Sequence, residues 1–166
     1  MKHIHDFSFA RRDRLAGFTM IEVVIVLLVL GILAILILNS LQTVQAKSRD
    51  STRRNHIDQI AQKLETCYDD KDKCGGAYPS LLQLTDTSPN GFVVTNLPGF
   101  NNDWLKDSSG GVIQTTDATA ATQYQYSTSP DDCTGTAGST KCTGFTLRAY
   151  QETNPDHPYV KDSFNK

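Results

Sequence analysis

The sequence predicts an α+β fold in which a long N-terminal helix, transmembrane in its first half, packs on a small antiparallel β-sheet. First, the aliphatic run Val23–Leu38 contains no charged residue. Second, no glycine or proline occurs from Ile32 to Cys74, and apolar residues recur at helical spacing between Ile57 and Tyr68. Third, the rest of the chain alternates short β-forming runs with turn-forming residues.

Length and charge limit the possible classes of protein. A chain of 166 residues accommodates one small domain and a membrane segment. The residues up to Gly17 carry four basic and two acidic side chains, so without them the net charge changes from −2 to −4. A mildly acidic chain argues against general nucleic-acid binding.

The apolar segment begins after a short basic leader. Together with Phe18–Ile21, the run Val23–Leu38 approaches the roughly 20 residues that span a bilayer as a helix. The leader arginines keep their side of the membrane cytoplasmic, so we expect the C-terminal part to be exported. Glu22 lies at the edge of the apolar run, where a carboxylate costs free energy and indicates a functional role.

The segment Gly17–Glu22, with the sequence GFTMIE, is followed by an unbroken apolar helix and resembles the leader-peptidase site of type IV pilins and pseudopilins. The resemblance implies leader cleavage after Gly17 and N-methylation of the new terminal residue, Phe18. It also implies that Glu22 contacts the Phe18 amine of a neighbouring subunit during filament assembly. Asn39 departs from the family, which usually has proline there.

The resemblance implies a type IV pilin-like fold and a structural, non-enzymatic function. The expected divisions are a leader (1–17), a transmembrane and filament-core half of the helix (18–40), an amphipathic half (41–74) and a β-sheet head with a disulfide loop (75–166). The precursor would cross the cell membrane once with its head outside the cytoplasm. After assembly it would belong to an extracellular pilus.

The implied partners are copies of the same chain, a prepilin peptidase that also methylates, and an inner-membrane assembly platform. The implied uses are adhesion, twitching motility or DNA uptake. A pseudopilin of a type II secretion system is an alternative within the same family.

A protein of another class remains a second alternative: an exported or membrane-anchored binding domain or enzyme. Val44-Gln45-Ala46 has the small-x-small pattern of a signal-peptidase site. Against a signal peptide, the apolar run is longer than usual, Glu22 interrupts its entry, and helix-forming sequence continues beyond it.

We expect one helix from Phe18 to about Tyr68, about 77 Å long at 1.5 Å per residue. Its second half contains a cluster of basic residues for which a solvated face of mixed charge is expected, with an Asp50–Arg54 pair four residues apart. The cluster could instead meet acidic patches on neighbouring subunits, or DNA. Its members are Lys47, Arg49, Arg53, Arg54 and His56.

The head should contain one or two helical turns at Pro79–Leu84 and four short strands. The last strand alternates apolar and polar residues and resembles the closing strand of a pilin sheet. The tail after Thr153 is expected to be mobile. The predicted strands are Phe92–Thr95, Val112–Thr116, Gln123–Ser127 and Phe145–Tyr150.

Four cysteines in the exported part allow three disulfide connectivities. We favour Cys67–Cys74 and Cys133–Cys142, because each pair closes a short polar loop. Zinc sites have two to four residues between paired ligands, and the gaps here are longer.

No catalytic residue and no cofactor are predicted. His56 and His157 have no recognisable nucleophile and acid beside them, and neither a phosphate-binding glycine loop nor an HExxH pattern occurs. An oxygen-rich loop at residues 101–110 makes Asp103 and Asp107 weak calcium candidates.

Overall fold

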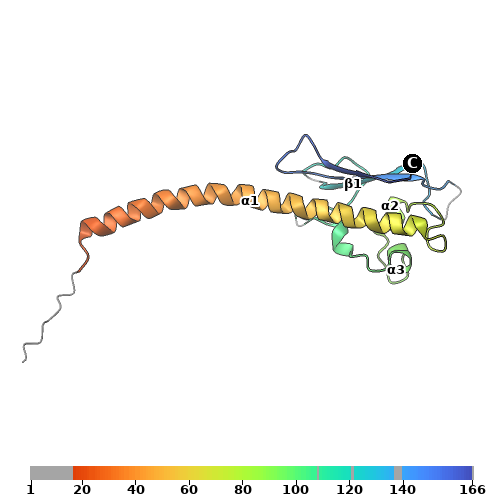
Figure 1. The fold of residues 1–166 in the computed structure, drawn as a ribbon, viewed down its shortest axis with the longest axis horizontal. Helices are drawn as coiled ribbons and strands as arrows, with labels where there is room; N and C mark the ends of the chain where they lie inside the picture. Colours follow the sequence, from red (N-terminus) through yellow and green to blue (C-terminus); the bar gives the residue numbers. More distant parts are fainter. Residues whose placement is uncertain (1–16, 108, 121, 137–139, 166) are drawn as a thin grey trace, which may run out of the picture. The chain divides into compact units, whose positions relative to one another are not determined.

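The computed structural model describes residues 17–107, 109–120, 122–136 and 140–165 (Figure 1). It confirms the α+β prediction: a long N-terminal helix is followed by short helices and a three-stranded antiparallel sheet, as in type IV pilins. The chain forms two compact units that divide between Leu41 and Gln42. All but the last residue of the predicted leader lies outside the described residues.

Helix α1 comprises 50 residues, Met20–Asp69, close to the predicted span. At its start the Glu22 amide donates to the Thr19 hydroxyl at 3.3 Å. At its end the Cys74 amide donates to the Asp70 carbonyl at 2.9 Å, and Gly75 adopts a positive φ of 61°. Glycine adopts this backbone conformation more readily than residues with a Cβ, so the predicted helix stop has a local cause.

The first unit consists mainly of the apolar half of α1. Its aliphatic side chains from Ile21 to Ile37 are all exposed. By length and composition α1 qualifies as a membrane-crossing helix. This half therefore needs an apolar environment from outside the chain.

In the second unit the sheet has the order β1-β2-β3, with β1 at Tyr124–Ser129, β2 at Gly144–Ala149 and β3 at Tyr159–Asp162. Tyr126 pairs with Leu147 across β1 and β2. On β2 the alternate residues Phe145, Leu147 and Ala149 are buried, as expected for a strand that covers a core with one face. On β1 the buried run is continuous from Tyr124 to Tyr126.

Side chains from α1 and the sheet form one hydrophobic core, to which the short helices contribute. These are α2 (Leu81–Thr85), α3 (Phe92–Asn96) and the 3-10 helix η1 (Asn102–Leu105). Tyr78 stacks on Tyr68 with ring centroids 4.6 Å apart and meets the ring of Phe145 edge-on at 4.9 Å. The main contributors from α1 are Ile57, Ile60, Ala61, Leu64 and Cys67.

The predicted strand at Phe92–Thr95 is wrong, because this segment forms α3. Asp86 fixes its start: its carbonyl accepts from the Val93 amide at 3.2 Å and its side chain accepts from the Phe92 amide. Val93 and Leu97 are then buried one helical turn apart. Local hydrogen bonds outweigh the β-propensity of the two valines.

The strand predictions for β1 and β2 are confirmed within two residues, but three other expectations are wrong. Val112–Thr116 forms only isolated bridges, including one from Gln114 to Gln125. The segment expected to close the sheet is its middle strand, because β3 pairs with the far side of β2. The tail after Thr153, expected to be mobile, contains β3.

Candidate functional site

The first candidate site is the start of α1. Gly17 and Phe18 precede the helix, and the Phe18 side chain is 82% exposed. Glu22 lies in the first turn, where the helix dipole favours an anion. The Gly17–Phe18 junction therefore lies outside the helix, and the Glu22 carboxylate follows it by about one helical turn.

This carboxylate precedes a long apolar surface. In the part of the chain described, no charged residue follows Glu22 in α1 until Lys47. Burying one aliphatic side chain stabilises by about 1.5–3 kcal/mol, so covering this surface strongly favours insertion into lipid or packing with other helices. A carboxylate entering the same environment then needs a cationic partner.

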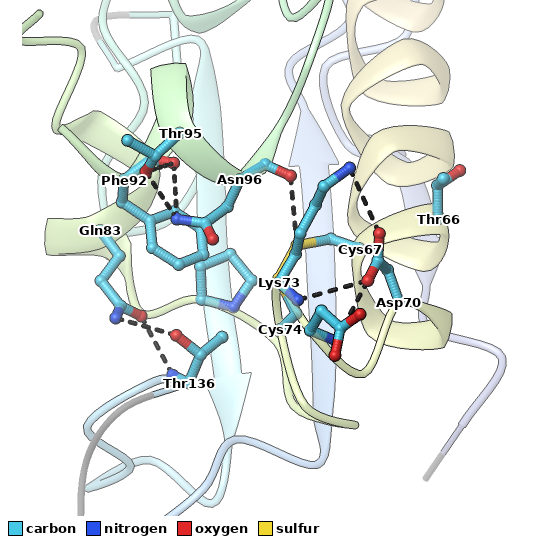
Figure 2. Close-up of a disulfide and its surroundings, with 12 residues drawn as sticks. Thr66, Cys67, Asp70, Lys73, Cys74, Gln83, Phe92, Thr95, Asn96 and Thr136 are labelled. Atoms are coloured by element: carbon cyan, nitrogen blue, oxygen red, sulfur yellow. Dashed lines mark hydrogen bonds and ion pairs between the residues drawn. A yellow bond between two sulfur atoms is a disulfide. The ribbon is translucent and has the colours of Figure 1, made fainter. Parts of the chain in front are cut away.

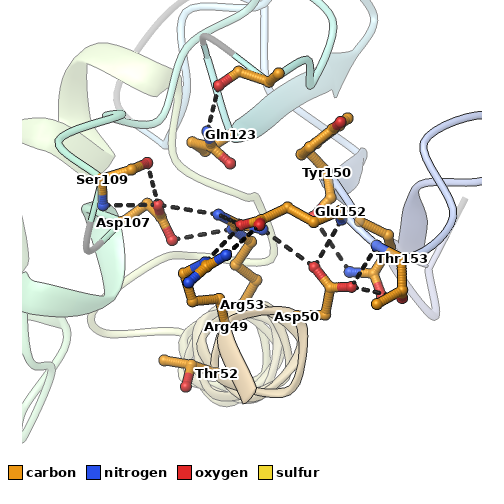
Figure 3. Close-up of polar contacts among 12 residues, drawn as sticks. Arg49, Asp50, Thr52, Arg53, Asp107, Ser109, Gln123, Tyr150, Glu152 and Thr153 are labelled. Atoms are coloured by element: carbon orange, nitrogen blue, oxygen red, sulfur yellow. Dashed lines mark hydrogen bonds and ion pairs between the residues drawn. The ribbon is translucent and has the colours of Figure 1, made fainter. Parts of the chain in front are cut away.

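The second candidate site is a buried ion cluster around Arg53, which is 1% exposed (Figure 3). Its guanidinium donates to Asp107 at 3.0 Å, to Asp50 at 3.1 Å and to Glu152 at 2.7 Å. Arg49 adds a two-point contact to Glu152, with its Nε 2.8 Å from one carboxylate oxygen. The cluster ties α1 to the loop after η1 and to the loop after β2.

Hydrogen bonds keep these carboxylates ionised. Burial favours protonation of Asp107, but donation from Arg53 and Ser109 outweighs it and lowers the pKa of the carboxyl. Burial acts in the same direction on Asp50, whose pKa is nevertheless lowered by hydrogen bonds from the Thr153 hydroxyl and amide at 2.6 and 2.9 Å. The pKa of Glu152 is lowered chiefly by its hydrogen bonds from Arg49.

The cluster corrects the sequence interpretation of this helix segment. The expected Asp50–Arg54 pair is wrong, because Asp50 pairs with Arg53 and the Arg54 Nε donates to Gln151 at 2.6 Å. The expected solvated face is also wrong for Arg53. The missed signal was the spacing of Arg49 and Arg53, which places two arginines on the face that continues the apolar stripe.

The two calcium candidates, Asp103 and Asp107, have different environments. Asp107 is buried and holds Arg53 and Ser109, whereas Asp103 is exposed and its amide donates to the Asn101 side chain at 2.9 Å. Among the described residues, no group of three or more His, Cys, Asp or Glu side chains is arranged to hold a metal ion. The Asp107 oxygens serve the ion cluster instead.

The two histidines lie in different environments. The His56 Nδ1 is 3.0 Å from the Tyr124 hydroxyl, and burial lowers the pKa of this histidine. His157 is exposed in the loop before β3. The structure does not bring them together.

Both favoured cysteine pairs are present as disulfides. Cys67–Cys74 links the last turns of α1 to the loop that follows, with Cα atoms 5.3 Å apart, next to an Asp70–Lys73 ion pair (Figure 2). Cys133–Cys142 closes the loop between β1 and β2, with Cα atoms 5.1 Å apart. The Tyr78 amide donates to the Cys142 carbonyl at 2.9 Å, so the loop is also attached to the segment after α1.

Comparison with known proteins identifies one motif in the chain. Residues 12–38 match the prokaryotic N-terminal methylation motif, the leader signature of type IV prepilins. The motif includes the Gly17–Phe18 junction, Glu22 and the apolar run. No curated protein and no solved structure was found to match the chain. The motif supports a pilin-like or pseudopilin-like prepilin, a membrane-anchored structural subunit rather than an enzyme.

Proposed function

We propose that this chain is a structural subunit of a type IV pilus, cleaved after Gly17, methylated at Phe18 and assembled from the membrane into a helical filament. The main support is the position of Glu22, one turn after the Gly17–Phe18 junction and at the entry to the exposed apolar half of α1. The methylation motif at residues 12–38 supports the same processing step.

Assembly exchanges the lipid around the apolar half of α1 for protein. In the membrane, the apolar half of α1 contacts acyl chains. In the filament, the same half packs against its copies, so the exchange preserves apolar contact. Cleavage creates a positive α-amine at Phe18, and Glu22 of a neighbouring copy supplies the negative partner. The pair fixes the axial position of each new subunit.

Mass spectrometry of the mature N-terminus tests the processing step. We expect a methylated Phe18 start, and we expect Gly17→Leu to retain the longer precursor in the membrane. A mature start at Leu41 or Lys47 would contradict the proposal and indicate a signal peptide.

The charge of Glu22 should be necessary for assembly. Leaving one partner of a buried ion pair unpaired costs about 3–5 kcal/mol, so Glu22→Gln and Glu22→Ala should each lower filament yield by about 100-fold or more. Cleavage and methylation should continue, because both occur before assembly. Measurement of sheared filaments and of the processed N-terminus separates the two steps. Normal yield in Glu22→Gln would refute the proposed pair.

Electron microscopy of the cell surface distinguishes the two filament systems. Long fibres composed mainly of this chain are expected for a pilus. A processed chain that forms no surface fibre and is required for protein secretion would contradict a pilus and indicate a pseudopilus.

A further inference from the structure

The second half of α1 carries an exposed stripe whose charge changes sign along the helix. At 3.6 residues per turn, Val44, Lys47, Ser51 and Arg54 lie within an arc of roughly 80°. All four are exposed. Arg53 and Asp50 point away from this arc and are buried in the ion cluster, so the stripe presents only positive charge in this part.

The same arc continues toward the end of α1 with negative charge. Asp58, Glu65 and Asp69 lie on it, and together with β3 and the C-terminal residues they line a groove of about 580 Å³. Asp162 adds a fourth carboxylate from the opposite side, and Lys161 is the one basic residue in the described lining. The described lining therefore carries a formal charge of −3.

Contacts within the chain position Glu65 in the groove and leave its charge in place. The Tyr78 hydroxyl donates to one oxygen of Glu65 at 2.8 Å, and the Phe164 amide donates to the other at 3.0 Å. Burial raises the pKa of Tyr78 to about 12, so this phenol stays protonated and does not neutralise Glu65. Lys161 reaches Asp58 at 3.5 Å, but both side chains are more than one third exposed. Such a pair is weak.

We propose that the basic part of this stripe, residues 44–54, docks in the acidic groove of a second copy. The proposal rests on the filament role proposed above, and its argument is charge complementarity between two parts of one helical face. All copies leave the membrane in one orientation, so their helices run parallel. Parallel copies in register would place like charges together and repel.

An axial offset removes this repulsion. An offset of about 11 residues places Lys47 opposite Asp58 and Arg54 opposite Glu65, and an offset of about 15 residues places Arg54 opposite Asp69. These offsets correspond to about 16–23 Å at 1.5 Å per residue. The charge reversal along the stripe thus favours staggered copies over aligned ones.

Apolar contact complements the charges. Phe164 at the groove is 80% exposed, and Val44 at the start of the stripe is 62% exposed. Phe164 lies beside Glu65, and at these offsets Val44 would lie opposite residues 55–59, so the two side chains belong to separate points of the same contact. Docking would cover both apolar side chains.

Charge reversal in the full-length chain tests this docking. Arg54→Glu and Asp69→Lys should each lower the yield of sheared filaments by roughly threefold or more, because they replace attraction by repulsion in every contact. The double variant should recover most of the yield, because it restores opposite charges. Lys106→Glu, an equal charge change at an exposed residue outside the stripe, is the matched control.

Cysteine crosslinking gives a second measurement. Arg54→Cys with Asp69→Cys should yield dimers and higher multimers of this chain when assembled filaments are oxidised, whereas Lys106→Cys should not. Three outcomes would each overturn the docking: single reversals with the same filament yield as Lys106→Glu, a double variant without recovery of the yield, and crosslinks to a different protein. If the unaltered chain forms filaments and the reversals have no effect, only the docking fails. If the unaltered chain is processed but forms no filament, the proposed function fails.

Discussion

Among single residues, Arg53 determines how α1 is attached to the loops of the head. Its guanidinium contacts three carboxylates, and those of Asp107 and Glu152 lie 54 and 99 residues further along the chain. A buried arginine without these partners would be costly, and the buried Asp50 and Asp107 would lose their cation without Arg53. The cluster therefore joins three segments through one side chain.

Removal of this side chain should destabilise the head strongly. We expect Arg53→Ala to lower the free energy of unfolding by about 3–5 kcal/mol, because it leaves buried carboxylates without their cation. Urea denaturation of the full-length chain in detergent measures the change. Lys47→Ala is the control, because it removes an exposed cation from the same helix and should cost about 1 kcal/mol or less. An equal loss in the two variants would contradict the central role of Arg53.

At the scale of elements, the end of α1 is stabilised by local contacts. The Cys67–Cys74 disulfide, the Asp70 hydrogen bonds and the Gly75 turn all lie within one short segment. The Lys63 ammonium donates to the Pro98 carbonyl at 2.7 Å and thereby attaches the last turns of α1 to the segment after α3. This end of the helix is the anchor for the connecting segment.

Loss of the Cys67–Cys74 disulfide should therefore weaken the connecting segment. A bridge that closes a loop of this length contributes about 2–3 kcal/mol in the chain-entropy description. We expect Cys67→Ser with Cys74→Ser to lower the free energy of unfolding by that amount and to raise hydrogen exchange around Ala77 and α2. Cys133→Ser with Cys142→Ser is the matched control, whose added exchange should lie between β1 and β2. The same exchange pattern in both variants would contradict separate local roles.

At the scale of the whole molecule, ionisable groups make the head sensitive to acid. Burial lowers the pKa of His56, so the unfolded chain takes up this proton at a higher pH than the folded chain. Stability is then lost as the pH falls below about 6.5. The pKa values of Asp50, Asp107 and Glu152 are also lowered, so a further loss follows as the pH falls below about 4.

Thermal unfolding of the full-length chain at pH 7.5, 5.0 and 3.0 tests this pH dependence. We expect the midpoint temperature to fall in both steps. His56→Gln should reduce the step from pH 7.5 to 5.0 and leave the lower step in place. A midpoint that rises between pH 7.5 and 5.0 would contradict the assignment of His56.

Part of this protein follows from local sequence. A helix without glycine or proline, an uncharged apolar run and the Gly17–Glu22 motif depend on neighbours a few residues away, so α1 and its candidate processing site were predictable. The cysteine pairs close short loops for the same reason. Alternation of apolar and polar residues was enough for β2.

The tertiary structure determined what depends on distant partners. Arg53 is buried because carboxylates from two remote loops meet it, and β3 is a strand because β2 offers it a free edge. Phe92–Asn96 is a helix because Asp86 fixes its first turn. The periodicity of a sequence shows which residues of one segment can face the core. These features arise instead from hydrogen bonds that form only when separate segments meet.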